Sequence, residues 1–194
     1  MSYIKNPVQV ITRKLDTGNP NFKISYPVVM GVENLYVQHK INDRIMWLVN
    51  KLIRDQIGAF SGEVADVMSI QTMIGWYEIK SNERGILSIS LGNYTYPYQA
   101  AHGMTVVKSL TCNVETGEFY ELSDMFKKDS NYVKVLSDII RKQIKERDIQ
   151  LLGEFKEIKP DQDYYIADKC LVIYFQLYEI AAYVYGILCF PISV

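Results

Sequence analysis

Histidine and cysteine, the residues that most often bind zinc or carry out redox chemistry, are scarce in this sequence. Its 194 residues include two histidines, His39 and His102, and three cysteines, Cys112, Cys170 and Cys189, all far apart. Local zinc and thioredoxin-like motifs need pairs separated by about two to five residues, and none occurs. Nucleophile-elbow, dinucleotide-binding and phosphate-binding glycine motifs are missing as well. The sequence therefore predicts no catalytic residue, no metal site and no cofactor, and we interpret the protein as a non-enzyme.

The sequence also has no excess of positive or of negative charge. The 21 Lys and Arg side chains are balanced by 22 Asp and Glu, which leaves a formal net charge of −1. Such a chain has no general field to attract a phosphate backbone, so nucleic acid is not an expected partner. The basic cluster Arg141, Lys142, Lys145 and Arg147 lies near the end of a predicted helix, where cations complement the helix dipole.

The sequence shows neither a secretory leader nor a membrane span. Its first 16 residues contain no apolar core and no small-residue cleavage site. As written, this predicts a cytoplasmic protein; an extracytoplasmic location requires that an N-terminal segment was removed. The stretch from Leu171 to Val194 is long enough to cross a bilayer, but it contains Gln176, Glu179 and Pro191. An acidic residue costs about 2.5 kcal/mol or more in an inserted helix, so two buried strands joined by a loop explain the stretch better.

What the sequence does contain is typical of one compact, soluble, mixed α/β domain. Hydrophobic residues make up 48% of the chain, and its 15 tyrosines suit strand packing, because the ring fills a pleated surface while the hydroxyl stays wet. Alternating apolar residues predict strands, for example from Ile86 to Tyr96. A 3.6-residue repeat predicts a long helix that begins after an N-cap at Asn34 and ends at Gly58. A second helix is predicted over about residues 132–147, capped by Ser130.

Three features are candidate ligand contacts. Tyr94, Tyr96 and Tyr98 alternate, so they share one face if the strand extends that far; exposed they form an aromatic platform, and buried they are ordinary sheet packing. His102 lies in a loop, where it either fixes the loop by a hydrogen bond or acts as a general base. Glu179 lies in an apolar stretch and needs donors, which either the amides of its own loop or His102 would supply.

Several motifs resemble those of the RsiV-like domain family, DUF3298. The stretch Tyr98 to Gly103 (Y-Q-A-A-H-G), the pair Thr116-Gly117 and the stretch Leu122 to Phe126 (L-S-D-M-F) are similar to the family's A-H-G, T-G and L-x-D-L-F pattern. The run from Leu171 to Tyr183 resembles its closing F-x-x-Y-E-I-A-P-Y motif, with Ala182 in the place of proline. The N-terminal half resembles the companion domain DUF4163, so the resemblances together cover nearly the whole chain.

The resemblance implies an α+β fold of two small lobes of mostly antiparallel strands, each with one main helix. The lobes would span residues 1–98 and 99–194 within one compact unit. Members of the family occur as extracytoplasmic parts of membrane-anchored anti-sigma factors, one of which is a lysozyme receptor, and before peptidoglycan deacetylase domains. The chain is therefore predicted to be a bacterial binding or sensing domain for a protein or a cell-wall glycan. Its predicted ligand contacts are Tyr96, Tyr98, His102, Tyr178, Glu179 and Tyr183.

Two other interpretations stay open. The first is an intracellular stand-alone protein that acts by association with itself or with a protein partner. The strand from Pro191 to Val194 would invite such pairing if it formed an exposed edge. The second is a hydrolase, which would need a pocket containing His102 beside a perturbed carboxylate. The sequence leaves the oligomeric state and the ligand open.

Overall fold

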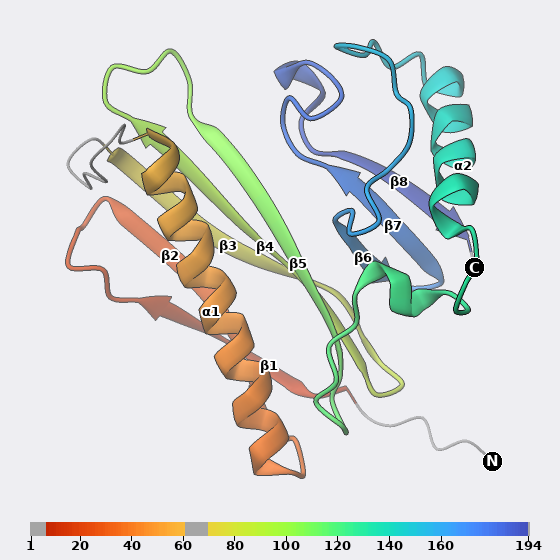
Figure 1. Ribbon diagram of the computed structural model, residues 1–194. Coiled ribbons are helices and arrows are strands. Elements are labelled where there is room, and N and C mark those ends of the chain that lie inside the picture. The colour runs from red at the N-terminus through yellow and green to blue at the C-terminus, as the bar shows by residue number, and fades with distance from the viewer. Residues whose placement is uncertain (1–6, 61–69, 194) are drawn as a thin grey trace. The chain divides into compact units, whose positions relative to one another are not determined.

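The computed structural model describes residues 7–60 and 70–193, and the chain divides into two compact units (Figure 1). The first unit ends at Glu118 and the second begins at Phe119. The boundary expected from the sequence lay between residues 98 and 99 instead. The boundary falls later because β5 (Met104–Asn113) pairs with β4 (Ile86–Pro97) along almost its whole length. The β4–β5 hairpin therefore belongs to the first unit as a whole.

The first unit contains a five-stranded sheet. Its strands, in spatial order, are β1 (Gln9–Leu15), β2 (Phe22–Met30), β3 (Ile70–Glu83), β4 and β5. Neighbouring strands are antiparallel except β2 and β3, which run parallel and pair only from Phe22↔Met73 to Ile24↔Gly75. Beyond Ile24, the described residues of β2 continue to pair with β1 but no longer with β3. The sheet therefore splits between β2 and β3.

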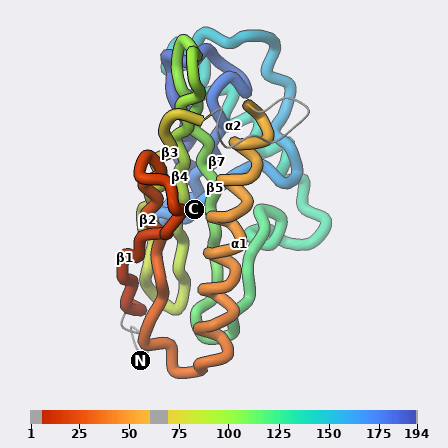
Figure 2. The backbone as a smooth tube through the Cα atoms, turned by 90° about the vertical axis from the view of Figure 1, so that its left-hand side faces the viewer, coloured from red at the N-terminus to blue at the C-terminus, as the bar shows by residue number. Residues whose placement is uncertain are grey.

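The helix α1 (Leu35–Phe60) lies along this sheet (Figure 2) and contributes buried apolar side chains to the core. Because its apolar side chains recur every three or four residues, they form one stripe that faces the strands. The helix is also joined to β2 by the Asn42 amide, which accepts a bond from the Val29 N–H at 2.8 Å and donates to the Val29 carbonyl at 2.9 Å. The buried residues of the stripe are Val37, Ile41, Ile45, Leu48, Val49 and Leu52, and those of β4 include Leu87, Ile89 and Leu91.

The predicted start of α1 is confirmed and its predicted end is wrong. The Oδ1 atom of Asn34 accepts hydrogen bonds from the N–H groups of Tyr36 at 3.0 Å and Val37 at 3.4 Å, as an N-cap does. Gly58 does not end the helix, which continues to Phe60. A glycine stops a helix when it takes a left-handed conformation, and Gly58 does not take one.

The second unit packs one helix against a three-stranded antiparallel sheet. Its buried core joins Leu136, Ile140 and Ile144 of the helix to Ile173 and Phe190 of the strands. Ser130 is not the helix cap, because Asn131 occupies that position. Each unit therefore has one main helix and mostly antiparallel strands, and the predicted α+β fold class is confirmed. The elements are η2 (Leu122–Met125), α2 (Tyr132–Glu146), β6 (Tyr164–Ala167), β7 (Cys170–Phe175), η3 (Tyr183–Tyr185) and β8 (Leu188–Ser193), with strand order β6-β7-β8.

The long apolar stretch near the C-terminus forms two strands, as predicted. β7 and β8 pair antiparallel from Cys170↔Ser193 to Phe175↔Leu188, and a loop containing η3 joins them. Across residues 7–60 and 70–193, no helix combines the length and the apolar character that a membrane span requires.

The outer edge of β8, which the sequence left open as an exposed edge from Pro191 to Val194, is covered in part by side chains of α2. Pro191 has no N–H to donate to a neighbouring strand. Its carbonyl accepts a hydrogen bond from Nε2 of Gln143 at 2.8 Å, and the carbonyl of Cys189 accepts one from Arg147 at 2.9 Å. Two side chains one helical turn apart on α2 thus occupy the acceptors that a second chain would use. Val194 itself lies outside the described residues.

Candidate functional site

A tight turn after β7 carries two of the predicted contact residues, Tyr178 and Glu179. The N–H of Glu179 donates to the carbonyl of Gln176 at 3.1 Å, which closes a four-residue turn. Tyr178, at the third position of this turn, has a φ of +63°. Such a left-handed backbone suits glycine and costs a residue with a bulky side chain about 1 kcal/mol or more. The chain therefore holds a large aromatic residue where glycine would be less strained.

Glu179 fixes this turn through both carboxylate oxygens. Its Oε2 atom accepts a hydrogen bond from the N–H of Gln176 at 2.8 Å. Its Oε1 atom accepts bonds from Nζ of Lys159 at 2.8 Å and from Nε2 of Gln162 at 3.3 Å. Gln162 is buried and also donates to the carbonyl of Tyr174 at 3.0 Å, which ties the carboxylate to the core strand β7. The turn containing Tyr178 is therefore anchored on its C-terminal side.

The predicted partners of Glu179 are confirmed in part. The amide of its own loop, Gln176, is one of them. Lys159 and Gln162 were not predicted, because nothing local in the sequence indicates that they lie beside this loop. The other predicted partner, His102, belongs to the first unit, and its pairing with Glu179 stays a prediction.

The hydrogen bonds around Glu179 also set its ionisation. Burial alone would raise its pKa above the ordinary 4.5, but bonds from Lys159, Gln176 and Gln162 outweigh burial and lower the pKa. The bond to Glu179 in turn raises the pKa of Lys159 above its ordinary 10.5. At neutral pH the two side chains therefore form an ion pair, with the carboxylate held in its charged form.

The side chains that surround this turn present an apolar surface. The rings of Tyr178 and Tyr183 lie 5.7 Å apart between centroids, inclined by 42°. Tyr178 is 43% exposed and Val184, next to Tyr183 in the chain, is 85% exposed. Leu152 is 61% exposed and is joined to the loop by its N–H, which donates to the carbonyl of Ile180 at 3.0 Å. Tyr183 itself is half-buried. We call Leu152, Tyr178 and Val184, together with the half-buried Tyr183, the exposed loop residues.

A groove of about 320 Å³ lies beside the anchored turn. The segment that follows α2 lines it together with side chains from β7 and from the turn. The lining combines apolar residues with the ion pair of Lys159 and Glu179. The lining residues are Leu151, Leu152, Gly153, Glu154, Phe155, Lys156, Glu157, Lys159, Gln162, Phe175, Glu179 and Ile180.

The other three predicted contacts, Tyr96, Tyr98 and His102, lie in the first unit. The hydroxyl of Tyr96 donates to the carbonyl of Ala100 at 2.9 Å, so this side chain closes its own loop. Tyr98 follows the end of β4 and is 65% exposed. His102 is exposed, and its Nδ1 lies 3.0 Å from the carbonyl of Gly103, to which the ring N–H donates. In the described part of the chain, no three His, Cys, Asp or Glu side chains are placed to hold a metal ion.

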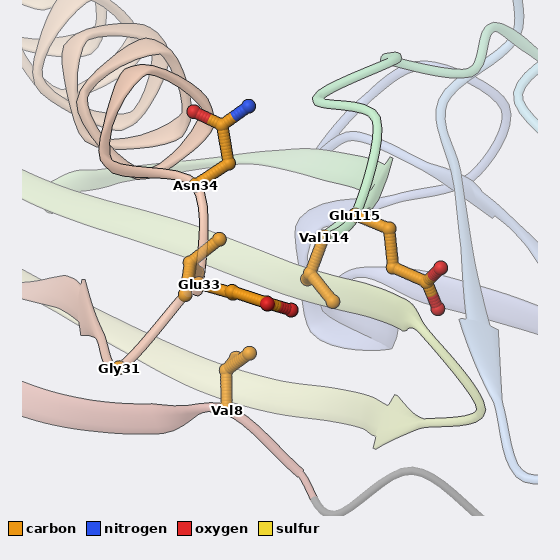
Figure 3. A pocket seen from close by; sticks show the side chains of 7 residues that line it. Val8, Gly31, Glu33, Asn34, Val114 and Glu115 are labelled. Atoms are coloured by element: carbon orange, nitrogen blue, oxygen red, sulfur yellow. The ribbon is translucent and has the colours of Figure 1, made fainter. Parts of the chain in front are cut away.

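A pocket in the first unit was not predicted from the sequence (Figure 3). It has a volume of about 510 Å³ and is lined by residues before β1, between β2 and α1, and after β5. Figure 3 shows the side chain of Glu33 extending from the β2–α1 connection toward Val114, with Val8 nearby. The residues that line this pocket come from three distant parts of the chain, and no local sequence pattern connects them.

The second unit coincides with a domain defined by sequence comparison. Residues 123–194 match the family described as "Protein of unknown function (DUF3298)". The resemblance of this part of the chain to the RsiV-like family DUF3298 is therefore confirmed. The A-H-G stretch at residues 101–103 precedes the matched residues, and the similarity of the N-terminal half to DUF4163 stays a prediction.

Two curated relatives come from Bacillus subtilis (strain 168). The anti-sigma-V factor RsiV is 27% identical over 97% of this chain and 68% of its own length. The peptidoglycan-N-acetylmuramic acid deacetylase PdaC is 24% identical over 90% of this chain but only 38% of its own length. The chain thus spans about two thirds of one relative and well under half of the other.

Two solved structures share the fold. A DUF3298 family member from Bacteroides fragilis NCTC 9343 superposes with a TM-score of 0.62 at 11% identity, over 98% of this chain and 90% of that one. A DUF3298 family protein from Pseudomonas aeruginosa PAO1 gives 0.66 at 12% identity, over 96% and 90%. At such low identity the likeness concerns the fold alone.

Proposed function

We propose that the protein is a non-catalytic binding or sensing domain whose main ligand contacts are Tyr178 and Tyr183. The observation that carries this proposal is the strained, exposed Tyr178 in a turn anchored by Glu179. A left-handed backbone at a bulky residue persists where surrounding bonds impose it, and such residues gather at ligand contacts. Glu179 is a positioning residue in this account, because its oxygens are taken up by donors of its own unit.

A protein is the ligand class that the exposed loop residues favour. Leu152 and Val184 add aliphatic surface to the two tyrosine rings, and exposed aromatic and aliphatic side chains together are typical of protein contact sites. The name of one relative refers to a sigma factor and that of the other to peptidoglycan. A cell-wall glycan is therefore the alternative ligand that the experiment must include.

Titration of the chain with lysozyme and, separately, with soluble peptidoglycan fragments tests this proposal. Two double variants divide the predicted contacts by unit: Tyr178→Ala with Tyr183→Ala, and Tyr96→Ala with Tyr98→Ala. We expect the first pair to weaken binding by about tenfold or more, since one lost anchor is worth about 1.4 kcal/mol or more. Loss of binding only in the second pair would move the site to the first unit, and binding that neither pair weakens would contradict the proposal.

The compartment of the protein decides which of these ligands it meets. The sequence as written predicts the cytoplasm, whereas a relative named for peptidoglycan acts on a cell-wall polymer. Fractionation of the source cells, followed by detection of the native chain, separates the two locations. A chain outside the membrane would support lysozyme or peptidoglycan as ligand, and a cytosolic chain would support an intracellular protein partner.

A further inference from the structure

Two segments of the second unit begin to pair as a ladder and then separate. Leu151 and Ala181 form an antiparallel bridge, and the N–H of Leu152 donates to the carbonyl of Ile180 at 3.0 Å. The chain bends at Leu152 and Gly153, and the ladder goes no further. The 320 Å³ groove is lined by residues from both segments. It therefore lies where a strand pairing is interrupted.

The segment after this bend is bonded to α2 along one edge. The carbonyl of Lys156 accepts a hydrogen bond from Arg141 at 2.6 Å, and the N–H of Ile158 donates to Oγ of Ser137 at 3.0 Å. Bonds from residues two apart to the same neighbour are the pattern of an extended chain, in which alternate residues face opposite edges. The backbone groups of Phe155 and Glu157 consequently face away from α2.

That opposite edge is open. Within the described residues, the backbone N–H and carbonyl groups of Phe155 and Glu157 make no hydrogen bond. An exposed row of such groups is a template for another strand. The edge is held in place by the ring of Phe155, which packs edge-on against Phe175 at 5.9 Å and lies 5.9 Å from the Arg141 guanidinium. Because the edge is already ordered, a strand that pairs with it loses less entropy.

We infer that this edge binds an extended peptide segment of a partner protein, which adds as a strand to residues 153–157. The main-chain bonds go to Phe155 and Glu157, and an apolar side chain of the peptide enters the groove against Phe155 and Ile180. In strand addition, main-chain bonds supply affinity and side-chain pockets supply specificity. This inference names the partner class and rests on the proposed binding function. A glycan has no amide groups at strand spacing to match this edge.

A library of linear heptapeptides displayed on phage, selected against the whole chain, supplies the probe. The best peptide is then synthesised and titrated against two matched variants, Glu157→Pro and Glu157→Ala. Both lose the carboxylate, but only the proline variant loses the N–H that the peptide would use. We expect the alanine variant to bind like wild type and the proline variant to bind about tenfold more weakly, as one lost main-chain bond implies. Thermal melting of both variants checks that they remain folded.

Hydrogen exchange locates the bound peptide without any substitution. The amides of Phe155 and Glu157 should exchange quickly in the free chain and become protected in the complex, whereas the amide of Ile158 is protected in both. No enriched peptide, equal binding by the two variants, or protection confined to other residues would overturn the inference. These outcomes are independent of the tyrosine variants. Lysozyme or peptidoglycan binding that depends on Tyr178 would leave the proposed function standing even if strand addition failed.

Discussion

The carboxylate of Glu179 and the backbone N–H of Gln176, 2.8 Å apart, close the turn in which Tyr178 takes its left-handed conformation. The same turn is closed from the other direction by the N–H of Glu179, which donates to the carbonyl of Gln176. Glu179 thus bonds both backbone polar groups of Gln176: its carboxylate accepts from the N–H, and its own N–H donates to the carbonyl. The two residues have separate roles in our account: Glu179 positions the turn, and Tyr178 contacts the ligand.

Replacing Glu179 by glutamine should lower stability and change its dependence on pH. The folded-state pKa of Glu179 is depressed below 4.5, so its contribution is present above that pH and is lost as the pH falls through the folded-state pKa. An amide cannot accept from all three donors, so we expect Glu179→Gln to lose about 1–3 kcal/mol of unfolding free energy at pH 7. Urea unfolding from pH 3 to 7 should show a smaller loss at the acidic end of this range.

The matched control is Glu157→Gln, which removes an exposed carboxylate of the same unit. It should leave the unfolding free energy within about 0.5 kcal/mol of wild type at every pH. Equal behaviour of the two variants would mean that the bonds around Glu179 contribute nothing to stability, and the positioning role would fail.

The alanine that replaces the family's proline should accept proline again. Ala182 has a φ of −64° and a ψ of 156°, which are values that proline itself adopts. Because proline reduces the freedom of the unfolded chain, Ala182→Pro should raise the melting temperature, with a gain of about 0.4–1 kcal/mol. A loss of stability would show instead that the Ala182 N–H is needed beside the bridge between Leu151 and Ala181.

Opening the edge of β8 should make the chain associate. Gln143→Ala and Arg147→Ala remove the two side chains that cover its carbonyls, and Pro191→Thr restores an N–H. Light scattering of the triple variant should show a mass that rises with concentration, whereas Lys145→Ala, which removes a charge from an exposed position on α2, should match wild type. A triple variant that scatters like wild type would mean that these side chains do not guard the edge.

Sequence reasoning found the elements that local patterns determine. The long helix follows from its apolar repeat, and its start follows from Asn34, whose side chain can cap only the residues that come next. The strands β7 and β8 follow from an apolar stretch that is interrupted by polar residues and glycine. In each case the signal lies within a few residues of the structure that it determines.

Features that depend on distant parts of the chain could not be predicted. The split between β2 and β3, beyond Ile24↔Gly75, depends on strands separated by the whole of α1. The donors Lys159 and Gln162 reach Glu179 only once the second unit has folded. The left-handed backbone of Tyr178 was missed because a tyrosine gives no local signal for it, whereas the bonds of Glu179 that hold the turn come from the folded unit.

The most direct test of the account is to measure stability and binding together in the variant Tyr178→Gly. Glycine relieves the left-handed strain but makes the unfolded chain more flexible, so we predict an unfolding free energy within about 1 kcal/mol of wild type. The affinity for the probe that binds wild type, lysozyme or peptidoglycan fragments, should fall by about tenfold or more because the contact ring is gone. Unchanged affinity in a folded Tyr178→Gly variant would contradict the account, since the strained tyrosine would then serve no ligand.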